Sequence, residues 1–116
     1  MPPTTARGLP SATAAALDRL DVGELTSSSV ALELETWRQV VSLPVAVLSA
    51  PHNDWTELIG PGARRVLEDA VQALDRRHGA PLRAELARLD ACLERKTSNN
   101  PFADPTQPWW ARRWWH

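Results

Sequence analysis

Cysteine is scarce in this chain of 116 residues, where Cys92 is the only one. A single thiol excludes a disulfide within the chain and favours a reducing compartment. The first ten residues lack the apolar core of a signal peptide. The longest apolar stretch, Leu43–Leu48, is far shorter than the roughly twenty residues that cross a bilayer. These absences predict a soluble, cytoplasmic protein.

An excess of charge of one sign is also missing. The formal net charge is −1, so the chain as a whole exerts no general attraction on nucleic acid. The distribution is nevertheless uneven. Residues 1–96 carry eleven basic and thirteen acidic side chains, whereas residues 97–116 carry two arginines and one aspartate. The body is therefore slightly acidic and the tail slightly basic.

Few residues are arranged for catalysis or metal binding. The three histidines lie in different segments: His52, His78 and His116. Turn and cap chemistry accounts for His52–Asp54 better than metal ligation does. Cys92 has no histidine near it in sequence, which favours a buried thiol over a nucleophile. The GPG sequence at Gly60–Gly62 lacks the Gly-Lys-Ser/Thr ending of a phosphate loop. We therefore predict no enzyme activity, no cofactor and no metal.

Apolar residues at helical spacing dominate the body. Residues 1–10 contain three prolines and a glycine, which predicts a disordered lead-in. Ser11 is the predicted N-cap of a short helix that ends near Gly23. A second helix begins around TSSS and ends or kinks at Pro44. Its apolar stripe is Val30, Leu34, Trp37 and Val41. A strand over VALEL is the alternative, but the helical spacing continues through Trp37 and favours the helix.

Two further helices are predicted to form an antiparallel hairpin. The first has an apolar face of Val66, Leu67, Ala70, Val71 and Leu74. Gly79 suits its C′ position, and Pro81 suits the first turn of the next helix. The second stripe is Leu82, Leu86, Leu89 and Leu93. A connector of about two residues makes the two helices antiparallel neighbours. Before the hairpin, Asp54 and Glu57 resemble a capping box that starts one or two turns.

Arginine pairs recur along the hairpin. Arg64 and Arg65 alternate with Glu68 and Asp69 at helical neighbour spacing, which predicts a solvated face whose charges pair with one another. Arg76–Arg77 is predicted in the last turn of its helix, where cations suit the macrodipole. The body as a whole predicts an all-α fold, a small bundle of three main helices plus one or two short ones. The predicted divisions are a lead-in at 1–10, the bundle domain at 11–96 and an extended tail rich in Pro and Trp at 97–116.

The tail concentrates four of the six tryptophans in the last eight residues. Prolines 101, 105 and 108 exclude a helix over Thr97–Pro108 and favour extended chain. The sequence WWARRWW then follows, and neither the helical nor the strand period gives it a clean amphipathic surface. Because chain ends are usually disordered unless something holds them, we expect this tail to dock.

Four interpretations of the tail are open. It can fold back so that its tryptophans complete the core of the bundle. It can instead bind another protein, because Trp and Arg dominate binding hot spots. A third interpretation is a membrane-interface anchor, since Trp favours the headgroup layer and Arg favours anionic lipid. Stacking on single-stranded nucleic acid ranks last, because two arginines make a poor electrostatic footprint.

The stretch from Asn100 to Trp115 reads NPFADPTQPWWARRWW and follows a helix rich in Leu, Arg and Asp. This ending resembles that of uncharacterised small helical proteins of actinobacteria, with the same PFADP and PWWARRWW elements. The ratio of twelve arginines to one lysine suggests a GC-rich bacterial genome. The resemblance covers this segment alone and implies no activity and no functional residues.

We predict a non-enzymatic protein–protein interaction module, an adaptor or small accessory subunit, that docks its partner through the tail. The alternative is a peripheral membrane protein anchored at the bilayer interface by the same tail. Nucleic acid is not an expected partner. The predicted partner-binding residues are Phe102, Trp109, Trp110, Arg112, Arg113, Trp114 and Trp115.

Overall fold

The computed structural model describes residues 9–23, 25–43, 60–99, 101 and 105–115. Four helices account for most of them: α1 (Ser11–Leu20), α2 (Ser27–Ser42), α4 (Gly60–Ala73) and α5 (Arg76–Lys96). The tail adds β1 (Thr97–Asn99), the 3-10 turn η2 (Trp109–Ala111) and β2 (Arg113–Trp115). The predicted all-α fold, a small bundle of three main helices plus one or two short ones, is confirmed. The predicted turns at Asp54–Glu57 and the motif His52–Asp54 lie outside the described residues.

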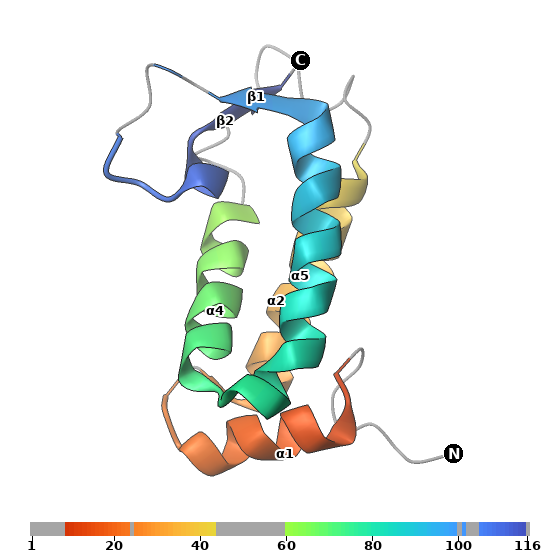
Figure 1. Cartoon of the computed structure of the whole chain (residues 1–116), viewed down its shortest axis with the longest axis vertical. Helices are drawn as coiled ribbons and strands as arrows, with labels where there is room; N and C mark the ends of the chain where they lie inside the picture. Colours follow the sequence, from red (N-terminus) through yellow and green to blue (C-terminus); the bar gives the residue numbers. More distant parts are fainter. Residues whose placement is uncertain (1–8, 24, 44–59, 100, 102–104, 116) are drawn as a thin grey trace.

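The three longer helices lie side by side along the long axis of the molecule, and each contacts the other two (Figure 1). The short helix α1 crosses one end of this bundle and packs on α2 and α5. The elements β1, η2 and β2 gather at the opposite end (Figure 1). Across the described part of the chain, no helix is both long and apolar enough to span a membrane.

The apolar stripes form the core as predicted. Trp37 is completely buried at its centre, and the other members of the α2 stripe are buried around it. The α5 stripe is buried as well: Leu82, Leu86, Leu89 and Leu93. On α4, Leu67, Ala70 and Val71 face the core, while Val66 is half-buried at its edge. Leu74, directly after the helix, is buried as well.

The first two helices are joined by a short turn with side-chain support. The carboxylate of Asp18 accepts hydrogen bonds from the backbone N–H and the hydroxyl of Ser27, both at 2.9 Å. These two bonds lower the pKa of Asp18. Asp21 ends α1 in the left-handed conformation at φ 50°, and Gly23 turns the chain at φ 29°. The turn therefore brings the start of α2 into contact with α1.

The start of α1 is one residue earlier than the sequence predicted. Pro10 occupies the N-cap position in extended conformation, and its carbonyl accepts the N–H of Ala14 at 2.9 Å. Ser11 is thus the first helical residue and not the cap. The cause is that proline fixes φ near the value needed to enter a helix and loses no N–H that the helix requires.

The ends of α2 are both held by side chains. Thr26 caps the start by accepting the N–H of Ser29 at 3.1 Å, within the predicted TSSS start. At the other end, the ammonium of Lys96 donates to the carbonyl oxygens of Val41 and Leu43 at 2.6 and 3.0 Å. A cation there satisfies carbonyls that lack a helical donor and complements the helix dipole. Lys96 therefore joins the end of α5 to the end of α2.

The boundary inside the helical hairpin differs from the prediction. The two-residue connector exists, but it is Leu74–Asp75, and α5 already contains Gly79 and Pro81. Asp75 takes the extended N-cap conformation, and its carbonyl accepts the N–H of Gly79 at 2.8 Å. Gly79 is therefore not the C′ residue of α4, and Pro81 is the sixth residue of α5 and not part of its first turn.

Close packing explains why the connector lies so early. Leu74 is buried, and a Cβ on Gly79 would meet the Leu74 Cβ at 3.4 Å. Burying Leu74 thus brings the start of α5 against the end of α4. As a consequence, Arg76–Arg77 stands in the first turn of α5, where the helix dipole does not favour cations, and the prediction of a last-turn position was wrong.

Candidate functional site

A buried ion pair links two helices of the bundle. Arg64 on α4 is only 5 % exposed, and its Nη2 lies 2.8 Å from Oδ2 of Asp90 on α5. The Arg64 Nε donates to Oδ1 of the same carboxylate at 3.1 Å, so two nitrogens of the guanidinium bind Asp90. The indole N–H of Trp37 donates to the same Oδ1, also at 3.1 Å. One carboxylate therefore joins α2, α4 and α5.

Glu68 completes the surroundings of this arginine. Its carboxylate accepts from Arg64 Nη1 at 3.0 Å, one helical turn along α4, and from the amide of Gln72 at 2.8 Å. Burial by itself would lower the pKa of Arg64, but the hydrogen bond and charge of Asp90, followed by those of Glu68, raise it. The guanidinium is therefore a permanent buried cation whose charge is matched by two carboxylates.

The sequence prediction for this arginine pair was half right. Arg65 is exposed, and the pairing of Arg64 with Glu68 is present. Arg64, however, is buried and not solvated, because it points inward to Asp90. Sequence reasoning missed Asp90, although its position gives a signal. Asp90 directly follows Leu89 on the leucine face of α5, where a carboxylate needs a buried partner.

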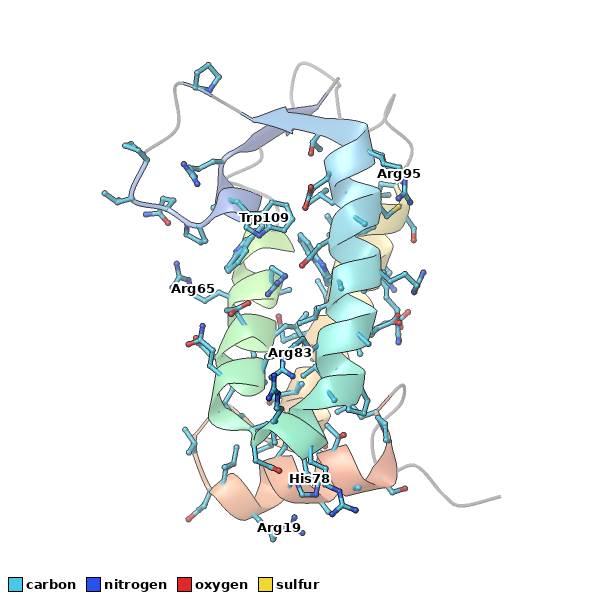
Figure 2. The ribbon with its side chains drawn as sticks, in the orientation of Figure 1. Arg19, Arg65, His78, Arg83, Arg95 and Trp109 are labelled. Carbon is cyan, nitrogen blue, oxygen red and sulfur yellow. The ribbon has the colours of Figure 1, made fainter. Side chains whose placement is uncertain are left out.

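Trp110 from the tail packs on this buried ion pair. The centroid of its ring lies 4.4 Å from the Arg64 guanidinium carbon in a cation–π arrangement, and the residue is 7 % exposed. Trp109 meets Trp110 edge to face, with ring centroids 6.0 Å apart. Trp109 is half-buried and lies where η2 meets the first turns of α4 (Figure 2). The tail is thus anchored over Arg64.

The local conformation of the tail follows from its sequence. Pro108 is extended at φ −64° and precedes η2, whose turn is closed by bonds from Ala111 N–H to the Pro108 carbonyl and from Arg112 N–H to the Trp109 carbonyl. The proline ring suits this entry because it has no N–H to lose in the first turn. Two adjacent tryptophans in one tight turn then give one ring to the core and leave the other at its edge.

A short strand pair holds the chain after η2. β2 pairs with β1 in antiparallel register, with Thr97 opposite Trp115, Ser98 opposite Trp114, and Asn99 opposite Arg113. β1 continues directly from α5, and the hydroxyl of its buried Thr97 donates to the Leu93 carbonyl at 2.8 Å. The end of the tail is therefore tied to the end of α5.

Arg112 lies between the 3-10 turn and the second strand with incomplete hydrogen bonding. The residue is half-buried, and its Nε is covered by protein atoms without an acceptor among the described residues. Leaving such a buried donor without an acceptor costs about 1–3 kcal/mol, and more when the group is charged. The docked tail thus leaves one strong donor unsatisfied.

The structure brings several of the predicted partner-binding residues together at one end of the bundle. Trp109, Trp110 and Arg112 lie within η2 or just after it, and β2 supplies the backbone of Arg113–Trp115. Phe102 lies outside the described residues. This arrangement corresponds to the interpretation in which the tail folds back on its own bundle, with Trp110 as the anchor.

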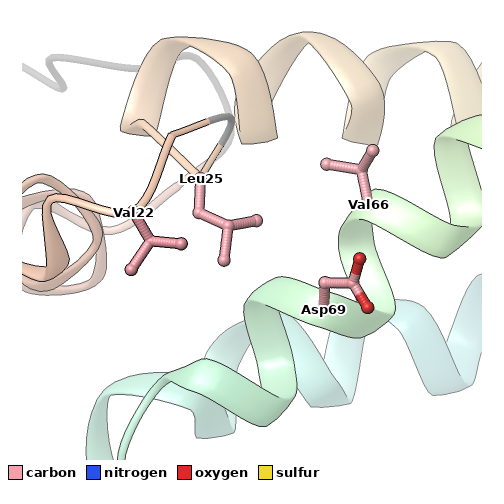
Figure 3. A pocket seen from close by; sticks show the side chains of 4 residues that line it. All are labelled: Val22, Leu25, Val66 and Asp69. Carbon is pink, nitrogen blue, oxygen red and sulfur yellow. The ribbon is translucent and has the colours of Figure 1, made fainter.

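A second surface feature lies at the other end of α4. Val22, Leu25, Val66 and Asp69 line a cavity of about 340 Å³ between the α1–α2 turn and α4 (Figure 3). Three of the four lining side chains are aliphatic, and Asp69 supplies the only carboxylate among them. Within the described ranges, no three His, Cys, Asp or Glu residues gather as potential metal ligands.

Comparisons with known proteins leave the site to be interpreted from its geometry. No protein-family model matches the chain, and neither the curated proteins nor the solved structures give a match. The likeness of the tail to actinobacterial proteins therefore stays a prediction.

Proposed function

We propose that the protein is a non-enzymatic adaptor or accessory subunit that binds another protein through the tryptophans and arginines of its C-terminal segment. The observation that carries this proposal is the buried Nε of Arg112, which has no acceptor among the described residues. A carboxylate or carbonyl oxygen from a partner would satisfy it. Docking on the bundle thus leaves a donor that a partner's oxygen would pair with once the segment moves.

The residue types of the segment support the same role. Trp and Arg are enriched among the residues that dominate protein–protein binding energy. Trp109 and Trp110 stand side by side, so a partner pocket that accepts one ring lies within reach of the other. The arginines that follow offer planar donors suited to carboxylates. We therefore expect a partner surface with an apolar pocket and an acidic rim.

Affinity capture tests this proposal. The full chain, tagged at its N-terminus, is incubated with a lysate of cells that make it naturally, beside the variants Trp109→Ala and Arg112→Ala. Arg19→Ala is the matched control, because Arg19 is exposed on α1 at the far end of the molecule (Figure 2). We expect one protein to be captured by the full chain and the control and lost from both tail variants.

Equal capture by all four chains would contradict binding through the tail. The membrane alternative is tested in parallel by flotation with vesicles of anionic lipid. Flotation that depends on Trp109, together with no tail-dependent protein capture, would replace the adaptor proposal with the peripheral membrane one.

A further inference from the structure

We propose that the contact of Trp110 with Arg64 is an autoinhibitory latch, and that partner binding requires the tail to leave the bundle. This inference rests on the proposed function, because it concerns the availability of the same segment. In the docked state Trp110 is 7 % exposed and covers the Arg64–Asp90 pair. A partner that binds the Trp110 ring therefore competes with the bundle for that ring.

Undocking of Trp110 does not disrupt the ion pair on which its ring packs. The ring of Trp110 packs on a guanidinium that is already neutralised by Asp90 and Glu68, so undocking leaves no unpaired charge behind. The hydrogen bonds of the ion pair run between Arg64 on α4 and Asp90 on α5, both within the bundle. The charges of the bundle thus stay paired when the tail leaves.

Docking of the tail also has an energetic cost, because it leaves a buried donor without an acceptor in the described part of the chain. The Nε of Arg112 is covered by the protein's own atoms, so an outside acceptor reaches it only after the segment moves. Release frees Trp110 and Arg112 in one event because both lie in the same short turn and its flank. Trp110 and Arg112 are therefore covered together in the docked state and become accessible to a partner together.

The strand pair offers a way to lock the latch. Asn99 and Arg113 are directly opposite each other in the β1–β2 register. Residues so placed have Cα atoms about 4.5–5.5 Å apart, which suits a disulfide. The variant Asn99→Cys/Arg113→Cys, made in a Cys92→Ala background, would hold the tail closed when oxidised and release it when reduced.

The probe is a Fab selected on a synthetic peptide of residues 108–116, and chosen because Trp110→Ala in that peptide abolishes its binding. We expect the Fab to bind the full chain roughly 5- to 30-fold more weakly than the free peptide, since only the open fraction is competent. Arg64→Lys keeps a cation for Asp90 but removes the planar group on which Trp110 lies. It should strengthen Fab binding by roughly 2- to 10-fold.

Arg65→Lys is the matched control, because Arg65 is the exposed neighbour on the same helix. Its Fab affinity should equal that of the unmodified chain. The oxidised disulfide variant should lose most Fab binding and recover it on reduction, and this comparison stands even if Arg64→Lys disturbs the fold.

Three results would overturn the latch: equal Fab affinity for the full chain and the peptide, no difference between oxidised and reduced disulfide variant, or no gain in a folded Arg64→Lys chain. The capture experiment is independent of the Fab. Tail-dependent capture with a failed Fab test refutes the latch and leaves the adaptor role standing, whereas a successful Fab test without tail-dependent capture refutes the adaptor role alone.

Discussion

The indole nitrogen of Trp37 and the Nε of Arg64 donate to one and the same oxygen, Oδ1 of Asp90, each at 3.1 Å. An aromatic residue at the centre of α2 and a cation on α4 are thereby aligned by a single carboxylate. Removing that carboxylate leaves a buried guanidinium and a buried indole N–H with fewer partners, so the three helices depend on Asp90 together.

Asp90→Ala should lower the free energy of unfolding by about 3–5 kcal/mol, the usual result of leaving one member of a buried ion pair uncompensated. Urea denaturation measures the change, and Asp69→Ala, which removes an exposed carboxylate from α4, should stay within about 0.5 kcal/mol of the parent. A comparable loss in both variants would show that burial of the Arg64–Asp90 pair is not the cause.

Trp110→Ala and truncation after Asp104 should lower the melting temperature equally, because each leaves the tail undocked. Burying one tryptophan ring is worth about 4–6 kcal/mol of gross stabilisation. Ordering the segment opposes this gain, so we expect a net docking free energy of about 1–2 kcal/mol and a fall of roughly 4–16 °C. Thermal unfolding followed by circular dichroism measures both variants. An unchanged melting temperature in either one would contradict docking on the bundle.

Gly79→Ala should stabilise the protein by about 0.5–1 kcal/mol, because Gly79 lies inside α5 and alanine is the better helix former. The added methyl group would meet Leu74 Cβ and the Val71 carbonyl oxygen at 3.4 and 3.6 Å, which are ordinary contacts. A C′ glycine in the left-handed conformation would give the opposite sign. Chemical denaturation of this one variant therefore tests where the second hairpin helix begins.

The bonds from Ser27 should make the start of α2 sensitive to acid. They depress the pKa of Asp18 below its ordinary value of 3.8. A carboxyl group with a depressed folded-state pKa contributes stability above its unfolded pKa and loses it as the pH falls through the folded value. The unfolding free energy should thus decline below about pH 4, and more steeply in the parent than in Asp18→Asn. Identical pH profiles would show that these bonds add nothing.

The periodic part of the fold could be predicted from the sequence, because burial of one helical face leaves a repeat that a single chain displays. The stripes ending at Val41 and Leu93 are both in the core. The hairpin boundary could not be predicted in the same way. Gly79 and Pro81 are common helix-end signals, and only the packing of Leu74 against the start of α5 shows that they lie inside a helix here.

The site was less accessible to sequence reasoning for a different reason. Arg64 and Glu68 have the spacing of an exposed ion pair, and this spacing is the same whether the arginine turns outward or inward. The deciding residue, Asp90, is twenty-six positions away. The composition of the tail indicated that it docks. Which of its tryptophans is buried depends on the three-dimensional position of the Arg64–Asp90 pair, and this position favours Trp110.

Lys96 gives the protein an unusual chemical property. It is the only lysine in the chain, and its ammonium is engaged by the carbonyl oxygens of Val41 and Leu43 immediately before β1 begins. Acylation of this one amine would remove both bonds and the positive charge at the end of α2. The rate at which an amine-reactive label modifies the Lys96 side chain therefore measures how firmly the ends of α2 and α5 are held together.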